Sequence, residues 1–218
     1  VHGDKVFDLT EQKYSQNMTS FIYGTDKNGK TVEITRLHGE ENRIWVDFDS
    51  IPKVLRDATI AIEDKRFYEH QGVDWITTMK ACLNMFFGGD EQFGGSTITQ
   101  QLIKNNIFPN FINESKYQRI ERKIQEQYLA LKIEKEMSKE EILEAYMNTI
   151  NLGQGCLGVQ TAAQRYFNKD AKDLTLSECA VIAAITQSPS NLNPVSNPEN
   201  NAKRRKKVLK NMKEQGFI

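Results

Sequence analysis

Apolar residues recur at helical spacing from Ile51 almost to the end of this 218-residue chain, and this pattern limits the folds that it can adopt. The nearly continuous apolar run 179–185 predicts a helix at the centre of the core. Capping boxes that begin at Ser138 and Thr175 mark the starts of two helices. We therefore expect a mainly α-helical domain over residues 51–218.

Residues 1–50 have the pattern of a small N-terminal β element. Asn28 and Gly29 lie between two alternating runs, which is the strongest short signal for a β-hairpin. Residues 44–48 predict a third short strand. We find no catalytic pattern here and expect a connecting or packing element.

Charge and hydropathy narrow the classes of partner. Basic and acidic residues number 29 each, so the net charge gives no support for a nucleic-acid partner. No apolar run approaches the roughly 18 residues of a membrane span, and the sequence opens without a signal-peptide pattern. We expect any membrane anchor to lie outside this chain.

Three cysteines, Cys82, Cys156 and Cys179, lie among apolar or small residues without CxxC spacing. An odd number without such spacing argues against a disulfide framework and against a zinc site. We expect buried free thiols, which pack as small apolar side chains.

A dense polar cluster follows the apolar helix face that begins at Ile51. Glu63 and Asp64 come at the end of this helix, and Phe67 and His70 follow closely. The negative end of the helix dipole and nearby apolar residues disfavour a charged carboxylate. We therefore expect a raised pKa for Glu63, as suits a general base. The alternative is a pair of acids at a solvated helix end.

Two glycines and Thr97 open a second polar cluster, which ends with Lys104 and Asn105. Thr97 with Gln100 has the spacing of a capping box. A helix start of this kind offers free N–H groups and a positive dipole end to an anion, and Lys104 adds a positive charge. A plain helix cap is the alternative.

A third polar cluster lies on a long helix whose apolar stripe begins at Ile120 and ends at Leu131. Arg122, Lys123 and Glu126 are spaced so that both cations can neighbour the carboxylate on one face. A solvated ion-pair face, which contributes little to stability, is the alternative.

Two other stretches are less regular. Residues 75–87 are strongly apolar and predict either a buried core helix or a segment that dips into a membrane interface. Residues 106–118 contain a proline and several polar residues, so we expect a loop.

Five blocks of this chain resemble, in order, the motifs of the peptidoglycan glycosyltransferases, the domain found in class A penicillin-binding proteins and monofunctional transglycosylases. The first is Glu-Asp-x-x-Phe-x-x-His-x-Gly from Glu63, and the second is Gly-Gly-Ser-Thr-Ile-Thr-Gln-Gln-Leu-x-Lys-Asn from Gly94. The series is completed by Arg-Lys-x-x-Glu from Arg122, Lys-x-x-Ile-Leu-Glu-x-Tyr-Met-Asn from Lys139, and residues 187–194.

This resemblance, which spans residues 51–194, implies a lysozyme-like fold of two lobes, with the small, membrane-proximal lobe at residues 72–115. It favours the membrane-dipping interpretation of residues 75–87. It also implies bacterial cell-wall synthesis by a processive, inverting glycosyltransferase that polymerises lipid II into glycan strands. Lipid II is the disaccharide-pentapeptide carried on undecaprenyl pyrophosphate.

The resemblance also assigns roles to individual residues. Glu63 would be the general base that deprotonates the acceptor sugar. Glu126, the second acidic residue, would orient nearby cations or a divalent metal, although no firm requirement for Mg²⁺ or Mn²⁺ is implied. The residues expected to bind substrate are Asp64, Phe67, His70, Ser96, Gln100, Gln101, Lys104, Asn105, Arg122 and Lys123.

Two further features concern the later motifs. Residues 106–118 make a longer connection than the family usually has, without a clean counterpart of a basic residue that the family places near the substrate's phosphates. Lys116 or Arg119 could substitute for it. Glu144 and Asn148, in the fourth motif, would be scaffold residues near the site.

The implied partners are lipid II and the growing strand, the membrane surface, a transpeptidase domain or partner, and the cell-wall synthesis machinery. The implied location is the extracytoplasmic face of the bacterial cell membrane. Two other functions stay open. A lysozyme-like lytic glycosidase also uses two acids in a helical groove, but it meets no pyrophosphate and has no need of clustered basic residues. A non-catalytic glycan- or lipid-binding module would keep its function in a Glu63→Gln variant.

Overall fold

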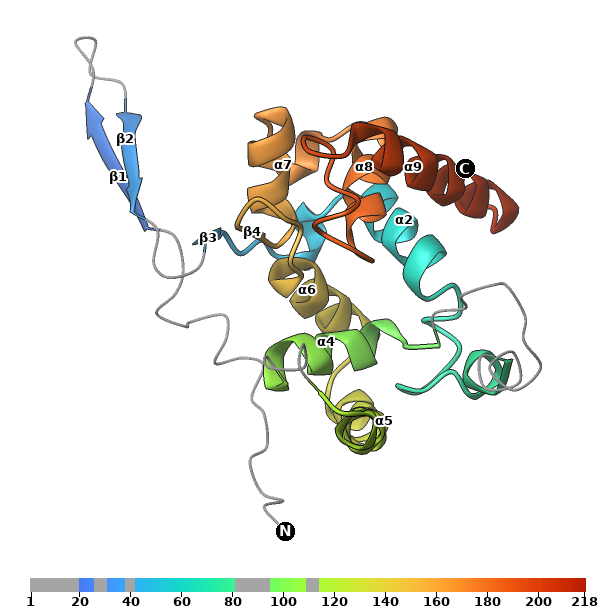
Figure 1. Ribbon diagram of the computed structural model, residues 1–218. Helices are drawn as coiled ribbons and strands as arrows, with labels where there is room; N and C mark the ends of the chain where they lie inside the picture. The colour runs from blue at the N-terminus through green and yellow to red at the C-terminus, as the bar shows by residue number, and fades with distance from the viewer. Residues whose placement is uncertain (1–19, 26–30, 38–41, 81–94, 109–113) are drawn as a thin grey trace.

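The computed structural model describes residues 20–25, 31–37, 42–80, 95–108 and 114–218 (Figure 1). These residues are mainly helical, with a small N-terminal β element, which confirms the predicted fold class. The helices are α2 (Lys53–Glu63), α4 (Ile98–Ile107), α5 (Lys116–Glu136), α6 (Lys139–Thr149), α7 (Val159–Phe167), α8 (Leu176–Ile185) and α9 (Pro198–Glu214). Short 3-10 turns are η1 (Phe48–Ser50) and η3 (Ala171–Asp173), and the strands are β1 (Ser20–Thr25), β2 (Thr31–Leu37), β3 (Asn42–Arg43) and β4 (Cys156–Leu157).

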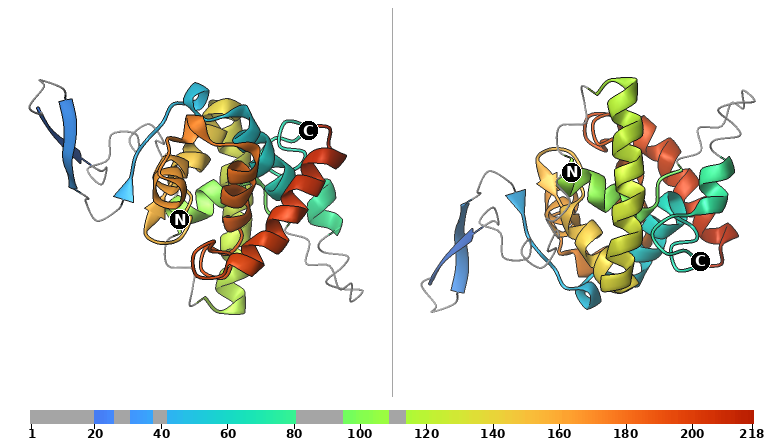
Figure 2. Two further views of the ribbon diagram at one scale, coloured as in Figure 1. Left: turned by 90° about the horizontal axis from the view of Figure 1, so that it is seen from above. Right: turned by 90° about the horizontal axis from the view of Figure 1, so that it is seen from below.

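The helices form two groups. Helix α8 packs against α2, α7 and α9, whereas α4 packs against α5 and α6. Figure 1 shows α6 between the two groups, and the views of Figure 2 agree with this arrangement of two lobes.

The α8 helix lies at the centre of its group, as its sequence predicts. Every residue from 179 to 185 is buried. Where α8 meets α2 and α9, the buried side chains are mostly alanine, which lets the three helix backbones approach closely. This packing fixes the position of the C-terminal end of α2, where Glu63 is the last helical residue.

The N-terminal hairpin and both capping boxes are confirmed. Strands β1 and β2 pair antiparallel, and the predicted turn at residues 26–30 lies outside the described residues. The side chains of Ser138 and Thr175 each accept a hydrogen bond from the backbone N–H three residues on, and their own backbone N–H groups donate to the carboxylates of Glu141 and Glu178.

The prediction of a strand at residues 44–48 is wrong. The short strand lies earlier, at β3, and pairs in parallel with β4. In the predicted segment, backbone N–H groups donate to side chains instead of to a neighbouring strand. The N–H groups of Val46 and Phe48 donate to Asn148 Oδ1 at 2.9 Å and Glu144 Oε2 at 2.8 Å. Glu144 and Asn148 are therefore scaffold residues for this N-terminal segment.

The connection predicted as a loop at residues 106–118 is shorter in the structure. Helix α4 continues to Ile107, and α5 already begins at Lys116. The sequence interpretation overlooked the capping box in which Ser115 and Gln118 cap the start of α5.

Helix α5 turns its apolar stripe outward. Tyr117, Ile120, Ile124 and Tyr128 are between 61% and 79% exposed. The buried residues of the helix are instead Arg122, Glu126, Ala130 and Ile133. An amphipathic helix usually buries its apolar face, so this orientation requires that the inward charges be paired.

The apolar stretch predicted at residues 75–87 is described only in part. Residues 75–80 are helical, and Trp75, Ile76 and Met79 are more than half exposed. The remainder lies outside the described residues. Across the described ranges, no helix combines the length and the apolar character needed to cross a membrane.

Two of the three cysteines confirm the expected free thiols. Cys156 and Cys179 are free and fully buried. Burial raises the pKa of the Cys179 thiol to about 12, so this group is inert at neutral pH. Cys82 lies outside the described residues.

Candidate active site

Donors from both groups of helices converge on the carboxylate of Glu63. Thr186, the residue that ends α8, donates its hydroxyl to Oε1 at 2.6 Å. Arg204 on α9 donates to the same oxygen at 3.3 Å. Gln101 on α4 donates its amide to Oε2 at 3.0 Å. Donors from three elements thus hold the Glu63 side chain. It is 9% exposed and still reaches solvent.

The amide of Gln101 is itself oriented from α6. Tyr146 donates its hydroxyl to Gln101 Oε1 at 3.2 Å, which turns the amide nitrogen toward Glu63. Burial and the nearby carboxylates of Glu63 and Asp64 hold the pKa of Tyr146 well above its ordinary value. The phenol therefore stays protonated and acts as a donor.

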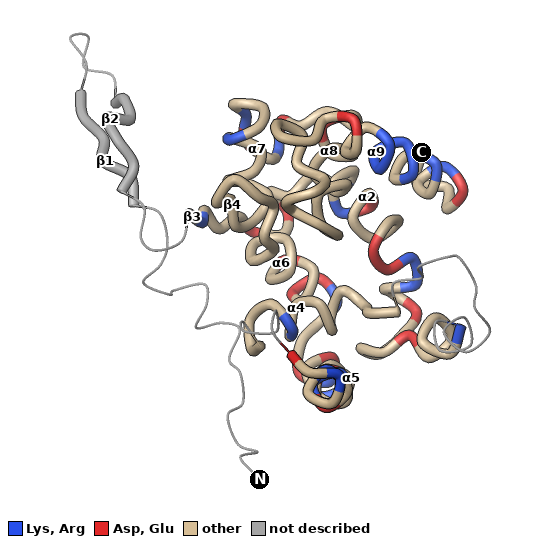
Figure 3. Tube along the Cα trace, viewed as in Figure 1, with Lys and Arg blue, Asp and Glu red and all other residues tan. Residues whose placement is uncertain are grey.

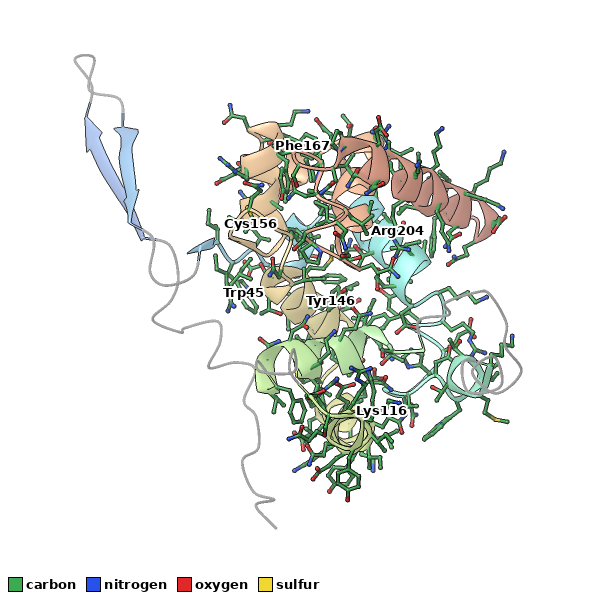
Figure 4. The ribbon with its side chains drawn as sticks, in the orientation of Figure 1. Trp45, Lys116, Tyr146, Cys156, Phe167 and Arg204 are labelled. Carbon is green, nitrogen blue, oxygen red and sulfur yellow. The ribbon has the colours of Figure 1, made fainter. Side chains whose placement is uncertain are left out.

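Sequence analysis identified Gln101 but missed Thr186 and Arg204. Arg204 belongs to the basic run 203–207 of α9, but its side chain is only 14% exposed and lies beside α2 (Figure 4). A signal was present, because Arg204 precedes the buried residues Val208 and Met212 by one and two helical turns.

Asp64 and His70 join the turn after α2 to the start of α4. The Asp64 oxygens lie 3.0 and 2.9 Å from His70 Nε2, and the N–H of Ile98 donates to Asp64 at 3.0 Å. Phe67 is fully buried in this turn, with the Lys139 ammonium 4.5 Å from its ring centre. These contacts support the shape of the site, and they leave the Phe67 ring no exposed surface.

The carboxylate of Asp64 occupies the anion site predicted at the start of α4. Asp64 accepts the N–H of Ile98, and the Thr97 hydroxyl oxygen accepts the N–H of Gln100 at 3.1 Å. Thr97 in turn donates to the carbonyl of Gly72 at 2.7 Å. The positive end of the α4 dipole therefore stabilises a carboxylate of the protein itself.

The inward face of α5 carries a paired charge cluster. Arg122 bonds to Glu126 and, at 2.7 Å, to Glu114. Lys123 lies 2.6 Å from the other oxygen of Glu126 and donates to Ser96 at 2.9 Å. Glu126 is fully buried, so its charge is balanced by two cations rather than by solvent. Glu114 was not foreseen, because it lies within the segment predicted as a loop.

Lys104 on α4 links this cluster to Glu63. Burial lowers the pKa of Lys104, and the positive charges of Lys123 and Arg122 act in the same direction. The carboxylates of Glu126 and Glu63 act in the opposite direction. The charges of Glu63 and of the α5 cluster therefore both act on the ammonium of Lys104. Figure 3 shows charged residues where α4 and α5 meet.

The remaining predicted residues lie on α4 close to these groups. Gln100 is buried, and its amide nitrogen has no hydrogen-bond partner within the described part of the chain. Asn105 is partly buried and follows Lys104 directly.

A metal role for Glu126 does not fit the arrangement of its neighbours. Arg122 and Lys123 occupy both of its carboxylate oxygens. Among residues that the structure describes, no three His, Cys, Asp or Glu side chains gather in an arrangement suited to a metal ion.

Comparison with known proteins places these features in one family. The sequence model of the family described as Transglycosylase matches residues 28–213. Penicillin-binding protein 1A of Neisseria flavescens is 42% identical over 207 residues, which is 95% of this chain and 25% of that protein. Penicillin-binding protein 1F of Bacillus subtilis (strain 168) is 44% identical over 210 residues, 96% of this chain and 28% of that protein.

Among solved structures, penicillin-binding protein 1A from Haemophilus influenzae matches with 26% identity and a TM-score of 0.49. The match covers 92% of this chain and 19% of that one. The chain thus spans about a quarter of the length of the curated relatives that it matches. On the match of the family model and the identity to these relatives, the chain belongs to the transglycosylase family.

Proposed function

We propose that this domain is a peptidoglycan glycosyltransferase that polymerises lipid II by inverting β-1,4 glycosyl transfer and releases undecaprenyl pyrophosphate. One observation carries the proposal. The carboxylate of Glu63 is held by donors from both groups of helices, and the charges of Glu63 and of the α5 cluster both act on the ammonium of Lys104. A base and a positive cluster on opposite sides of a reacting carbon are what such a transfer needs.

Glu63 acts on the acceptor sugar. Its carboxylate takes the proton of the 4-hydroxyl group, and the hydroxyl oxygen attacks the anomeric carbon of the growing strand. The bond between that carbon and the pyrophosphate oxygen breaks on the opposite face, and its electron pair leaves with the pyrophosphate. Attack and departure on opposite faces invert the configuration.

The basic residues act on the leaving group. Lys104, Arg122 and Lys123 supply positive charge where the pyrophosphate gains negative charge. Glu126 orients Arg122 and Lys123, because it is buried and bonded to both. Ser96 extends this group through its bond to Lys123.

Asp64 and His70 keep the loop after α2 in place, and Phe67 supports them from the core. Gln101 orients the base, and Gln100 and Asn105 lie on the same helix. These residues bind or position substrate, with Glu63 and the cations at the reacting atoms.

The domain works at a lipid surface. The exposed side chains of residues 75–80 and the outward stripe of α5 together supply apolar and aromatic groups that suit a membrane interface. In the complete protein we place the domain at the extracytoplasmic face of the bacterial membrane, alongside a transpeptidase domain or partner and other cell-wall synthesis proteins. The names of the relatives, which are penicillin-binding proteins, support this placement.

The test is incubation of the protein with labelled lipid II in detergent, with products resolved by size. Long glycan is the expected product. Binding of lipid II without any polymer would contradict the proposal and favour a binding module. Shortening of preformed glycan would contradict it in favour of a lytic glycosidase.

A further inference from the structure

The two oxygens of the Glu63 carboxylate have different surroundings. Oε1 accepts from both Thr186 Oγ1 and Arg204 Nη2. Within the described part of the chain, Oε2 accepts from Gln101 Nε2 alone. A carboxylate oxygen has two lone-pair sites, so Oε1 is filled and Oε2 keeps one site open.

Helix α9 also holds the backbone beneath this carboxylate. Asn211 and Gln215 donate their side-chain amides to the carbonyl of Ala61 at 3.0 and 3.1 Å. Ala61 lies in the last turn of α2, where carbonyl groups have no partner within the helix. Helix α9 therefore fixes the last turn of α2 through the backbone and through the Glu63 side chain.

We propose that Arg204 is a positioning residue for the base. Together with Thr186 it anchors Oε1, and it leaves Oε2 as the oxygen that receives the proton of the acceptor hydroxyl. The hydroxyl O–H bond breaks as the new O–H bond forms at Oε2. This inference rests on the proposed function, in which Glu63 is the general base.

The charged and titratable groups around Glu63 define what loss of Arg204 would do. Arg204 faces it from α9, Lys104 from α4 and the Tyr146 phenol from α6, while Asp64 follows it in the chain. Helix α8 contributes the uncharged hydroxyl of Thr186. Without Arg204, the carboxylate loses its direct ion pair and one of the two donors to Oε1.

The experiment compares Arg204→Ala and Arg204→Lys with wild type in lipid II polymerisation, over a range of pH and lipid II concentrations. We expect Arg204→Ala to lower kcat by about 10- to 100-fold, the effect of one charge-assisted hydrogen bond, with little change in KM. The pH dependence of kcat should also differ from that of wild type. Added guanidinium ion should restore part of the rate of Arg204→Ala. Arg204→Lys should show a smaller loss of kcat than Arg204→Ala.

Lys206→Ala is the matched control, because it removes an exposed positive charge from the same helix. It should retain the wild-type rate and profile. A wild-type kcat and pH profile for Arg204→Ala would overturn the inference, as would a loss of rate with no change in profile and no rescue by guanidinium. If Arg204→Ala does not fold, Arg204→Lys and Thr186→Val provide the same comparison of kcat and profile.

The result is separable from a failure of the proposed function. Polymerisation by Glu63→Gln at the wild-type rate would contradict the assignment of Glu63 as the general base. If Glu63→Gln is inactive and Arg204→Ala is fully active, only the positioning role of Arg204 is contradicted, and the proposed function stands.

Discussion

Lys123 bridges two elements of the site: its ammonium lies 2.6 Å from Glu126 Oε2 and 2.9 Å from Ser96 Oγ. Glu126 belongs to α5, and Ser96 lies just before α4. The buried carboxylate thereby sets where the cation lies relative to α4. In the proposed function, this second acidic residue would act on substrate through the cations that it orients.

Replacement of Glu126 by glutamine should lower the free energy of unfolding by about 3 kcal/mol, because Lys123 and Arg122 lose their shared buried counter-charge. Urea denaturation measures this difference. Glu121→Gln, at an exposed position of the same helix, should change the free energy of unfolding by less than about 0.5 kcal/mol. Equal values for the two variants would contradict a central role for Glu126.

Gly72 ends the first motif at a point of close contact with α5. Its φ is +85°, and a Cβ there would lie 2.5 Å from the carbonyl oxygen of Ala130. Gly155 has a similar φ of +72°, but a Cβ there would meet nothing within 4 Å. The pair separates the cost of backbone conformation from the cost of a clash.

Gly155→Ala should therefore lose about 1 kcal/mol of stability, from the left-handed conformation alone. Gly72→Ala should lose about 2 kcal/mol more, since α5 must move away from the turn. Denaturation of both variants by urea gives the comparison. A loss for Gly72→Ala no greater than that for Gly155→Ala would mean that the approach to α5 is not tight.

Local signals in the sequence predicted the parts of the fold that depend on neighbouring residues. The capping boxes at Ser138 and Thr175 involve a partner three residues away, and both are confirmed. The end of α2 at Glu63 follows in the same way from its apolar spacing. The segment 44–48 failed because its partners, Glu144 and Asn148, lie on a distant helix.

The orientation of α5 and the anchors of Glu63 could not be derived from spacing. Periodicity shows which residues of a helix share a face. It does not show which face is buried when the charged side chains of the polar face can be paired inside the protein. The inward charges of α5 depend on Ser96 and Glu114, which lie outside the helix. Arg204 is 141 residues from Glu63, and only the packing of α9 on α2 brings them together.

Lys104 should give the reaction a limit at alkaline pH. Its pKa is lowered by burial and by Lys123, so it loses its positive charge at a lower pH than an exposed lysine. Arginine stays charged above about pH 12, so in Lys104→Arg the alkaline limb of the polymerisation rate should move to higher pH.

Measurement of initial rates between roughly pH 7 and 11 covers this limb. Lys135→Arg, at an exposed position on α5, is the control and should keep the wild-type profile. An unchanged alkaline limb in Lys104→Arg would show that another group sets it.

The outward stripe of α5 should contribute to membrane binding. Replacement of Ile120 and Ile124 by serine removes two exposed apolar side chains, and we expect binding to vesicles of phosphatidylglycerol and phosphatidylcholine to weaken about tenfold or more. Co-sedimentation measures the bound fraction. Gln125→Ser, beside the stripe, should bind as wild type.

Stability separates this effect from damage to the fold. Both isoleucines are more than half exposed, so the double variant should unfold at the wild-type urea concentration. Vesicle binding that is unchanged in the double variant would assign the stripe to some other contact.

The most direct test of the account is polymerisation of lipid II by Glu63→Gln beside wild type, with binding of lipid II measured in parallel. Glutamine keeps the shape of the side chain but cannot accept the proton. We predict a loss of polymer of at least about 100-fold with lipid II still bound. Polymer formed by Glu63→Gln at the wild-type rate would contradict the assignment of Glu63 as the base.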